Sequence, residues 1–145
     1  MDNISPHITY LEATRTSTGL PNEPNAEQVE SMVLAANRVF EPVRRFINAP
    51  IIVSSFFRSP KVNAAVGGSA TSQHVKGEAI DIKRTGQNSK IFEYIKNKLT
   101  FDQLIWEFGT ETEPAWVHVS YKRNGNRMQV LKAVKVNGKT KYIRL

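Results

Sequence analysis

The stretch "SQHVKGEAID", residues Ser72 to Asp81, places a histidine and an aspartate seven positions apart, with a glycine between them. The chain has three histidines and no cysteine, so a metal site would have to use nitrogen and oxygen ligands. A catalytic zinc site commonly takes its protein ligands from two histidines and a carboxylate and leaves one position open for water. His74 and Asp81 could therefore supply two ligands of such a site.

The residues around this pair predict how the two side chains are presented. "GGSATSQH" is typical of a flexible loop ending at His74, and Ala79 to Lys83 alternates apolar residues with Asp81, as a half-buried strand does. Gly77 would let the chain turn sharply between them, so that both side chains could reach one point. The alternative is an exposed loop histidine and an unrelated charge at a strand edge.

A third histidine lies in "AWVHVSY", residues Ala115 to Tyr121. In a strand, Trp116, His118 and Ser120 share one face, and the apolar side chains of Val117 and Val119 share the other, which predicts a core-facing side. His118 then faces ligand or solvent and could complete the set of metal ligands. Without a metal, it would be a cross-strand partner only.

The whole chain reads as one α+β domain, residues 1–145, with an antiparallel sheet and helices packed on one face. Residues 1–24 are expected to be an irregular arm with a short ordered piece near Tyr10. Apolar spacing predicts a helix from Asn25 to Ile47, kinked at Pro42, a short helix opened by Pro60, and a helix over Asn88–Leu99. Strands are expected at Ala49–Ser55, Ala79–Lys83, Asp102–Phe108, Ala115–Tyr121, Met128–Val136 and Lys139–Ile143.

Composition narrows the classes of partner. Twenty basic against thirteen acidic residues give a net charge of +7, which favours nucleic acid, anionic lipid or an acidic wall polymer, although solubility alone would also explain it. No apolar run is long enough to cross a membrane. The N-terminus lacks the basic start and apolar stretch of a secretory signal, so no signal peptide is expected.

Four motifs, "SSFFRSP", "NAAVGGSATSQHVKGEAIDI", "FDQLIWEF" and "AWVHVSY", resemble the zinc D-alanyl-D-alanine carboxypeptidases and phage endolysin peptidases that share a fold with the hedgehog signalling domain. The resemblance runs from about Asn37 to the C-terminus and includes the S-x-H-x(6)-D pattern. It implies a hedgehog/DD-peptidase-like fold, with His74, Asp81 and His118 binding one zinc ion. Zinc would lower the pKa of its bound water to about 7 and so activate it to attack a peptide carbonyl.

The same resemblance assigns two further residues. Arg58 in "FFRSP" matches the family arginine that stabilises the developing oxyanion or orients substrate, and its alternative is a surface arginine that caps a turn. Ser72 matches a substrate-contacting serine, although serine is common in loops. Trp116 and Trp106 could line a substrate cleft, with core packing as the alternative for both.

The general base is where the sequence departs from the family pattern, because Ala115 stands at the expected acidic position. If Asp102–Phe108 pairs with Ala115–Tyr121, Glu107 falls nearly opposite Trp116, on the face of His118. Glu113 would face the other side, so Glu107 is the predicted base. A slip of one residue in register would reverse that choice.

The function that the resemblance implies is hydrolysis of peptide bonds in the peptidoglycan stem or cross-link by a monomeric, phage endolysin-like enzyme. Such an enzyme would stay in the host cytoplasm until lysis or travel with the virion, and anionic wall polymers would be a second partner. A non-catalytic, zinc-containing wall-binding module is the alternative, because of Ala115. Nucleic acid and membrane are not expected partners. His7 is expected at the surface of the arm, and Tyr121 in the core.

Overall fold

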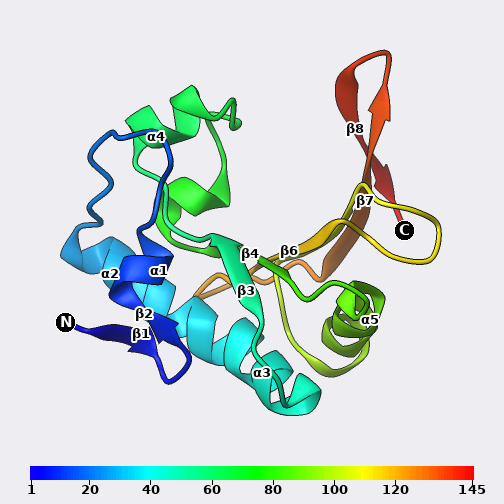
Figure 1. Cartoon of the computed structure of the whole chain (residues 1–145), viewed down its shortest axis with the longest axis horizontal. Coiled ribbons are helices and arrows are strands. Elements are labelled where there is room, and N and C mark those ends of the chain that lie inside the picture. Colours follow the sequence, from blue (N-terminus) through cyan, green and yellow to red (C-terminus); the bar gives the residue numbers. More distant parts are fainter.

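The computed structural model of the protein describes all 145 residues and contains two β-sheets with helices beside them (Figure 1). In chain order the elements are β1 Asn3–Ser5, β2 Ile8–Thr9, α1 Tyr10–Ala13, α2 Ala26–Ala35, the π-helical η1 Ala36–Phe40, α3 Glu41–Ile47, β3 Ile52–Ser55, α4 Pro60–Ala65, the 3-10 helix η2 Gln73–Lys76, β4 Ala79–Lys83, α5 Asn88–Lys98, β5 Gln103–Glu107, β6 Trp116–Ser120, β7 Gln129–Val136 and β8 Lys139–Arg144. The α+β class expected from the sequence is confirmed.

The main sheet has six strands in the order β3-β4-β6-β5-β7-β8 and is mixed. All neighbours are antiparallel except β5 and β7, which are parallel. The connection after β6 returns to the start of β5, where the Met128 and Gln129 amides donate to the Phe101 and Asp102 carbonyls. This return starts β7 alongside β5 in the same direction, so the prediction of a purely antiparallel sheet is wrong at this pair.

Helices α2, η1, α3 and α5 cover one face of the main sheet, as predicted (Figure 1). The core between the helices and the sheet includes Phe40 and Phe92 from the helices and Ile80, Leu104 and Val119 from the strands. These strand residues alternate with the polar residues of the opposite face, which is therefore free to form a site.

The long helical segment begins and bends where the sequence predicts. Asn25 and Gln28 form a reciprocal capping box at the start of α2. Pro42 lies in the first turn of α3, and the π-helical turn η1 joins α2 to α3 just before it. The predicted interruption at Pro42 is thus absorbed by one widened turn.

The N-terminal residues are more ordered than the irregular arm expected from the sequence. Strands β1 and β2 pair with each other, and Ile4 and Ile8 belong to the hydrophobic core. His7 Nδ1 lies 2.7 Å from Oε1 of the buried Glu41, which also accepts a hydrogen bond from Ser5 Oγ. Strands this short carry no readable alternation of apolar residues, which is why the sequence did not indicate them.

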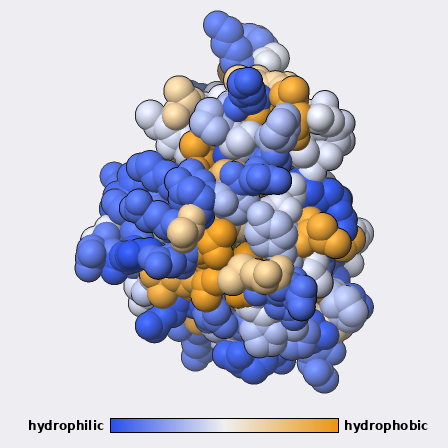
Figure 2. All heavy atoms as spheres, turned by 90° about the vertical axis from the view of Figure 1, so that its left-hand side faces the viewer, coloured by the Kyte–Doolittle hydropathy of each residue, from blue (hydrophilic) through white to orange (hydrophobic).

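Strands β7 and β8 form a hairpin that extends beyond the body of the molecule (Figure 1). Its turn residues Asn137 and Gly138 both have positive φ, at 52° and 77°, as a type I′ turn requires. Figure 2 shows a mainly hydrophilic surface, with the hairpin tip standing above the rest of that face. None of the helices has the length and apolar character to cross a membrane.

Candidate metal centre

A cleft of about 830 Å³ lies on the face of the sheet opposite the helices. Trp116 and His118 line it, whereas Val117 and Val119 are fully buried in the core. The alternation predicted for β6 is therefore confirmed. A cleft of this volume is of the size that usually holds a small ligand or a peptide segment.

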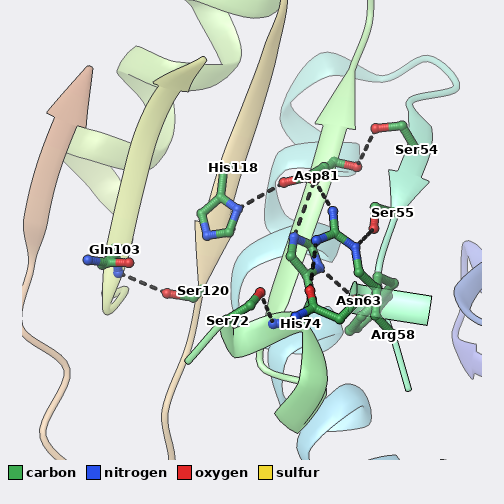
Figure 3. A network of polar contacts seen from close by, with 11 residues as sticks. Ser54, Ser55, Arg58, Asn63, Ser72, His74, Asp81, Gln103, His118 and Ser120 are labelled. Carbon is green, nitrogen blue, oxygen red and sulfur yellow. Dashed lines mark hydrogen bonds and ion pairs between the residues drawn. The ribbon is translucent and has the colours of Figure 1, made fainter. Parts of the chain in front are cut away.

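The three predicted ligands come together at the floor of this cleft (Figure 3). Asp81 on β4 and His118 on β6 are register partners, with His118 Nδ1 at 2.9 Å from Asp81 Oδ1. His74 Nε2 lies 3.2 Å from the other carboxylate oxygen, Oδ2. One potential ligand atom from each residue lies within 4.8 Å of the other two, which is compatible with a shared metal ion.

His74 is held in place by the short helix that carries it and by one backbone contact to its ring. It lies on η2, whose first turn Ser72 caps by accepting a hydrogen bond from the His74 amide, and Gly77 ends this helix with a φ of 75°. The Nδ1–H group of the buried ring donates to the Phe56 carbonyl at 2.7 Å. Since a carbonyl can only accept, this bond fixes Nδ1 as a donor and directs Nε2 at Asp81, an arrangement typical of metal-binding histidines.

The charge of Asp81 is balanced within the cluster. Burial alone would raise its pKa, but the charges and hydrogen bonds of His74 and His118 hold the pKa well below its usual range. The site thus offers two imidazole nitrogens and an ionised carboxylate, with no thiolate in the chain. That donor set fits zinc.

Arg58 points into this site from the segment between β3 and α4 (Figure 3). Its Nε donates to Ser55 Oγ at 3.1 Å and its Nη1 to Asn63 Oδ1 at 3.3 Å, while Nη2 lies 3.7 Å from Asp81 Oδ2. The guanidinium is therefore held beside the predicted metal ligands. It does not cap a turn at the surface.

The side chain of Glu107 faces the same cleft, and its carboxyl group has no hydrogen-bond partner within the chain. Glu107 pairs with Trp116 in the register of β5 and β6, as the sequence predicted, two positions along from the pair formed by Ile105 and His118 and so on the same face. The side chain is 7% exposed. Burial raises the pKa of Glu107 to about 7, with a smaller upward contribution from the Asp81 charge. An unpaired, buried carboxyl group whose pKa is close to neutrality is characteristic of catalytic sites.

Glu113 has a structural role elsewhere. Its carboxylate accepts hydrogen bonds from the Gly86 and Asn88 amides at 3.0 and 3.1 Å, at the N-terminal end of α5. A negative charge there stabilises the helix. Glu113 is consequently held away from the His74, Asp81 and His118 cluster, as parity predicted.

The other aromatic residues divide between cleft and core. Trp116 lines the cleft and packs edge-on against Phe108, with ring centroids 5.5 Å apart. Trp106 packs against Phe92 in the core, and Tyr121 is partly buried against the same core. Ser72 lines the cleft as well as capping η2.

Two features of the cleft have no signal in the sequence. Fully buried Asp102 accepts hydrogen bonds from Arg127 Nε and Nη2 and from Gln73 Nε2, next to His74 in the chain. Tyr142 lines the cleft from β8, and burial, followed by the Glu107 charge, raises its pKa. Both depend on contacts between distant parts of the chain, which no local pattern encodes.

Comparison with known proteins adds one finding. A family model described as Peptidase M15 matches residues 6–120, a segment that includes every predicted site residue. No curated protein matches the chain.

Proposed function

Because the chain belongs to the peptidase M15 family of zinc metallopeptidases, we propose that it hydrolyses peptide bonds in the stem or cross-link of bacterial peptidoglycan. The single observation that supports catalysis most strongly is the buried carboxyl group of Glu107, unpaired and facing the same cleft as the His74, Asp81 and His118 cluster. Glu107 supplies the acidic function that Ala115 lacks, which favours an enzyme over a binding module.

His74, Asp81 and His118 would hold the zinc ion. When bound, zinc acts as a Lewis acid that activates water and polarises the scissile carbonyl. Proton transfer is proposed to depend on Glu107. Glu107, ionised, accepts a proton from the attacking water and can return it to the leaving amine, a role for which a pKa near neutrality is well suited.

Arg58 is the proposed electrostatic partner of the substrate. Its guanidinium is always charged, and Ser55 and Asn63 hold it in place, so it can donate to the carbonyl oxygen as negative charge develops there. Ser72 and Trp116 both line the cleft and are proposed to contact the peptide.

The biological setting that we propose is that of a phage endolysin or virion-associated lysin acting as a monomer on the cell wall. The support is the resemblance of the site motifs to such enzymes, together with the net charge of +7, which favours contact with anionic wall polymers. Nucleic acid is not proposed as a partner, because the net charge is the only observation that would favour it.

The test is digestion of purified peptidoglycan by the zinc-loaded protein, with and without a chelator, followed by mass spectrometry of the released muropeptides. The expected result is zinc-dependent release of fragments that identify the cleaved bond. Zinc-loaded protein that sediments with the wall and releases nothing would instead favour the non-catalytic binding module.

A further inference from the structure

The β7–β8 hairpin forms one wall of the cleft. Leu131, Lys135, Thr140 and Tyr142 line it, and all four lie after residue 120, where the family match ends. This wall is therefore additional to the matched region. It is the part of the cleft where the binding preference of this chain can differ from that of the family.

Strand register places the hairpin wall beside the proposed reacting groups. Glu107 pairs with Ala133 on β7, and Ala133 pairs with Tyr142 on β8, so the three residues form one row across the sheet. Only the small side chain of Ala133 separates Glu107 from the phenol. A peptide that runs from the metal cluster along the cleft would thus contact the hairpin wall.

Phe108 links the hairpin wall to the rest of the cleft through an unusual backbone conformation. Its φ is 55° and that of Gly109 is 77°. Strict alternation would send Phe108 to the helix-covered face with Trp106, but the left-handed conformation turns it to the cleft instead. Left-handed conformation is costly for a bulky residue, by about 1–3 kcal/mol, and such conformations cluster at functional sites.

Lys135 is held over this aromatic residue. Its Nζ lies 5.3 Å from the centroid of the Phe108 ring and donates to Thr140 Oγ1 at 3.1 Å. By contrast, Lys132 on the other face of β7 pairs with Glu111. No carboxylate of the chain pairs with Lys135, so this exposed ammonium group keeps two of its three N–H donors free at the edge of the cleft.

Resting on the proposed peptidase function, we infer that Lys135, positioned by Thr140 and Phe108, is the binding site for a side-chain carboxylate of the substrate peptide. The hairpin then selects anionic peptides over neutral ones. The ligand class follows from the chemistry of the site, since an ammonium group with free N–H donors in a cleft pairs best with a carboxylate.

The test compares two synthetic stem peptides as substrates of the zinc-loaded protein. One carries its glutamate and diaminopimelate carboxylates free, and the other carries both as carboxamides. The expected result is a KM about tenfold lower for the carboxylate peptide, the size of one partly exposed charge-assisted hydrogen bond, with similar kcat. Equal KM values would overturn the inference while leaving the peptidase proposal intact, and failure to cleave either peptide would count against the peptidase proposal itself.

Variants of the hairpin identify the residue responsible. Lys135→Ala should abolish the preference by raising KM for the carboxylate peptide alone, and Lys135→Arg should retain it. Lys141→Ala is the matched control, because it removes the same charge from β8 but Lys141 does not line the cleft. Equal loss of the preference in Lys135→Ala and Lys141→Ala would indicate general attraction to the basic hairpin, and would overturn the assignment to Lys135.

Discussion

Asp81 and His118 face each other across β4 and β6, with His118 Nδ1 at 2.9 Å from Asp81 Oδ1. Their positions are set by the hydrogen-bond ladder between two central strands, which requires no metal to form. The sheet itself therefore sets the relative positions of two of the three predicted ligands.

Replacing His118 by alanine is expected to remove stoichiometric zinc binding. The loss of one ligand should weaken zinc affinity by at least about 100-fold, since even changes to outer-shell partners can cost that much. Metal content after dialysis measures this directly. His7→Ala is the control, because His7 contacts Glu41 and lies outside the cluster; zinc retained at one equivalent by His118→Ala would remove His118 from the ligand set.

Zinc should also raise the melting temperature of the wild-type protein but not that of His118→Ala. A ligand that binds only the folded state, present at about 100 times its Kd, stabilises the fold by about 2.7 kcal/mol. Calorimetry with and without a chelator tests this. An equal shift in both proteins would mean that zinc binds elsewhere.

Glu107→Gln is expected to keep the metal and to lose at least about 100-fold in kcat, because the amide cannot accept the proton of the attacking water. Glu113→Gln is the matched control. It weakens the acceptor at the start of α5 and should lower stability by about 1 kcal/mol with the rate nearly unchanged. The opposite pattern, with the rate lost in Glu113→Gln, would show that Glu107 is not the base.

The pKa of Glu107 predicts how pH affects the metal-free protein. Burial raises this pKa from 4.5 to about 7, so folding disfavours the ionised form. Stability should fall as pH rises from about 5 to 8, by an amount on the order of 3 kcal/mol from this group. Thermal melts of Glu107→Gln should show a smaller decline in stability over this pH range. Equal declines in the wild-type protein and in Glu107→Gln would show that Glu107 is not the group whose ionisation destabilises the fold.

In the zinc-loaded enzyme the positive charge of the ion should lower the pKa of Glu107. The value of kcat/KM should therefore rise with pH over a range that lies below pH 7.

Asp102→Asn tests the contact that holds β7 beside β5. Burial alone would raise the pKa of Asp102, but the hydrogen bonds from Arg127 lower it overall. The ionised form therefore stabilises the fold above the unfolded pKa, and this contribution is lost as pH falls through the folded pKa. The variant should lose about 3 kcal/mol at neutral pH, with a smaller difference in acid, as measured by denaturant unfolding. A difference that does not depend on pH would exclude the carboxylate charge as its cause.

Gly77→Ala should disturb the helix that carries His74. Gly77 has a φ of 75°, and an added Cβ would lie 2.7 Å from the Gln28 carbonyl oxygen. Gly86 has a φ of 87° but open space around it, so Gly86→Ala isolates the cost of the backbone conformation, about 1 kcal/mol. Gly77→Ala should cost more than that and should also weaken zinc binding. Equal effects of the two substitutions would show that the contact with α2 is unimportant.

The sequence predicted the strands of the site to within about one residue, because alternation is local and β4, β5 and β6 are long enough to display it. It also predicted the face of His118 and the register that places Glu107 beside it. The direction of β7 was not predictable, since the contacts at its start, such as that between Asp102 and Arg127, join residues 25 positions apart. The same holds for Lys135 and Tyr142, which reach the cleft only because β7 pairs with β5.

Three neighbouring strands, β4, β6 and β5, carry Asp81, His118 and Glu107, whereas the hairpin that walls the cleft is attached at the edge beyond them. A shift of one residue in the register of any of these three strands would turn its reactive side chain into the core. The proposed activity therefore requires that this register be kept. The β7–β8 hairpin is not under that constraint, so the sequence and length of its tip can change without moving these groups. Sequence changes that alter substrate preference should therefore accumulate in the hairpin, while β4, β5 and β6 keep their residues.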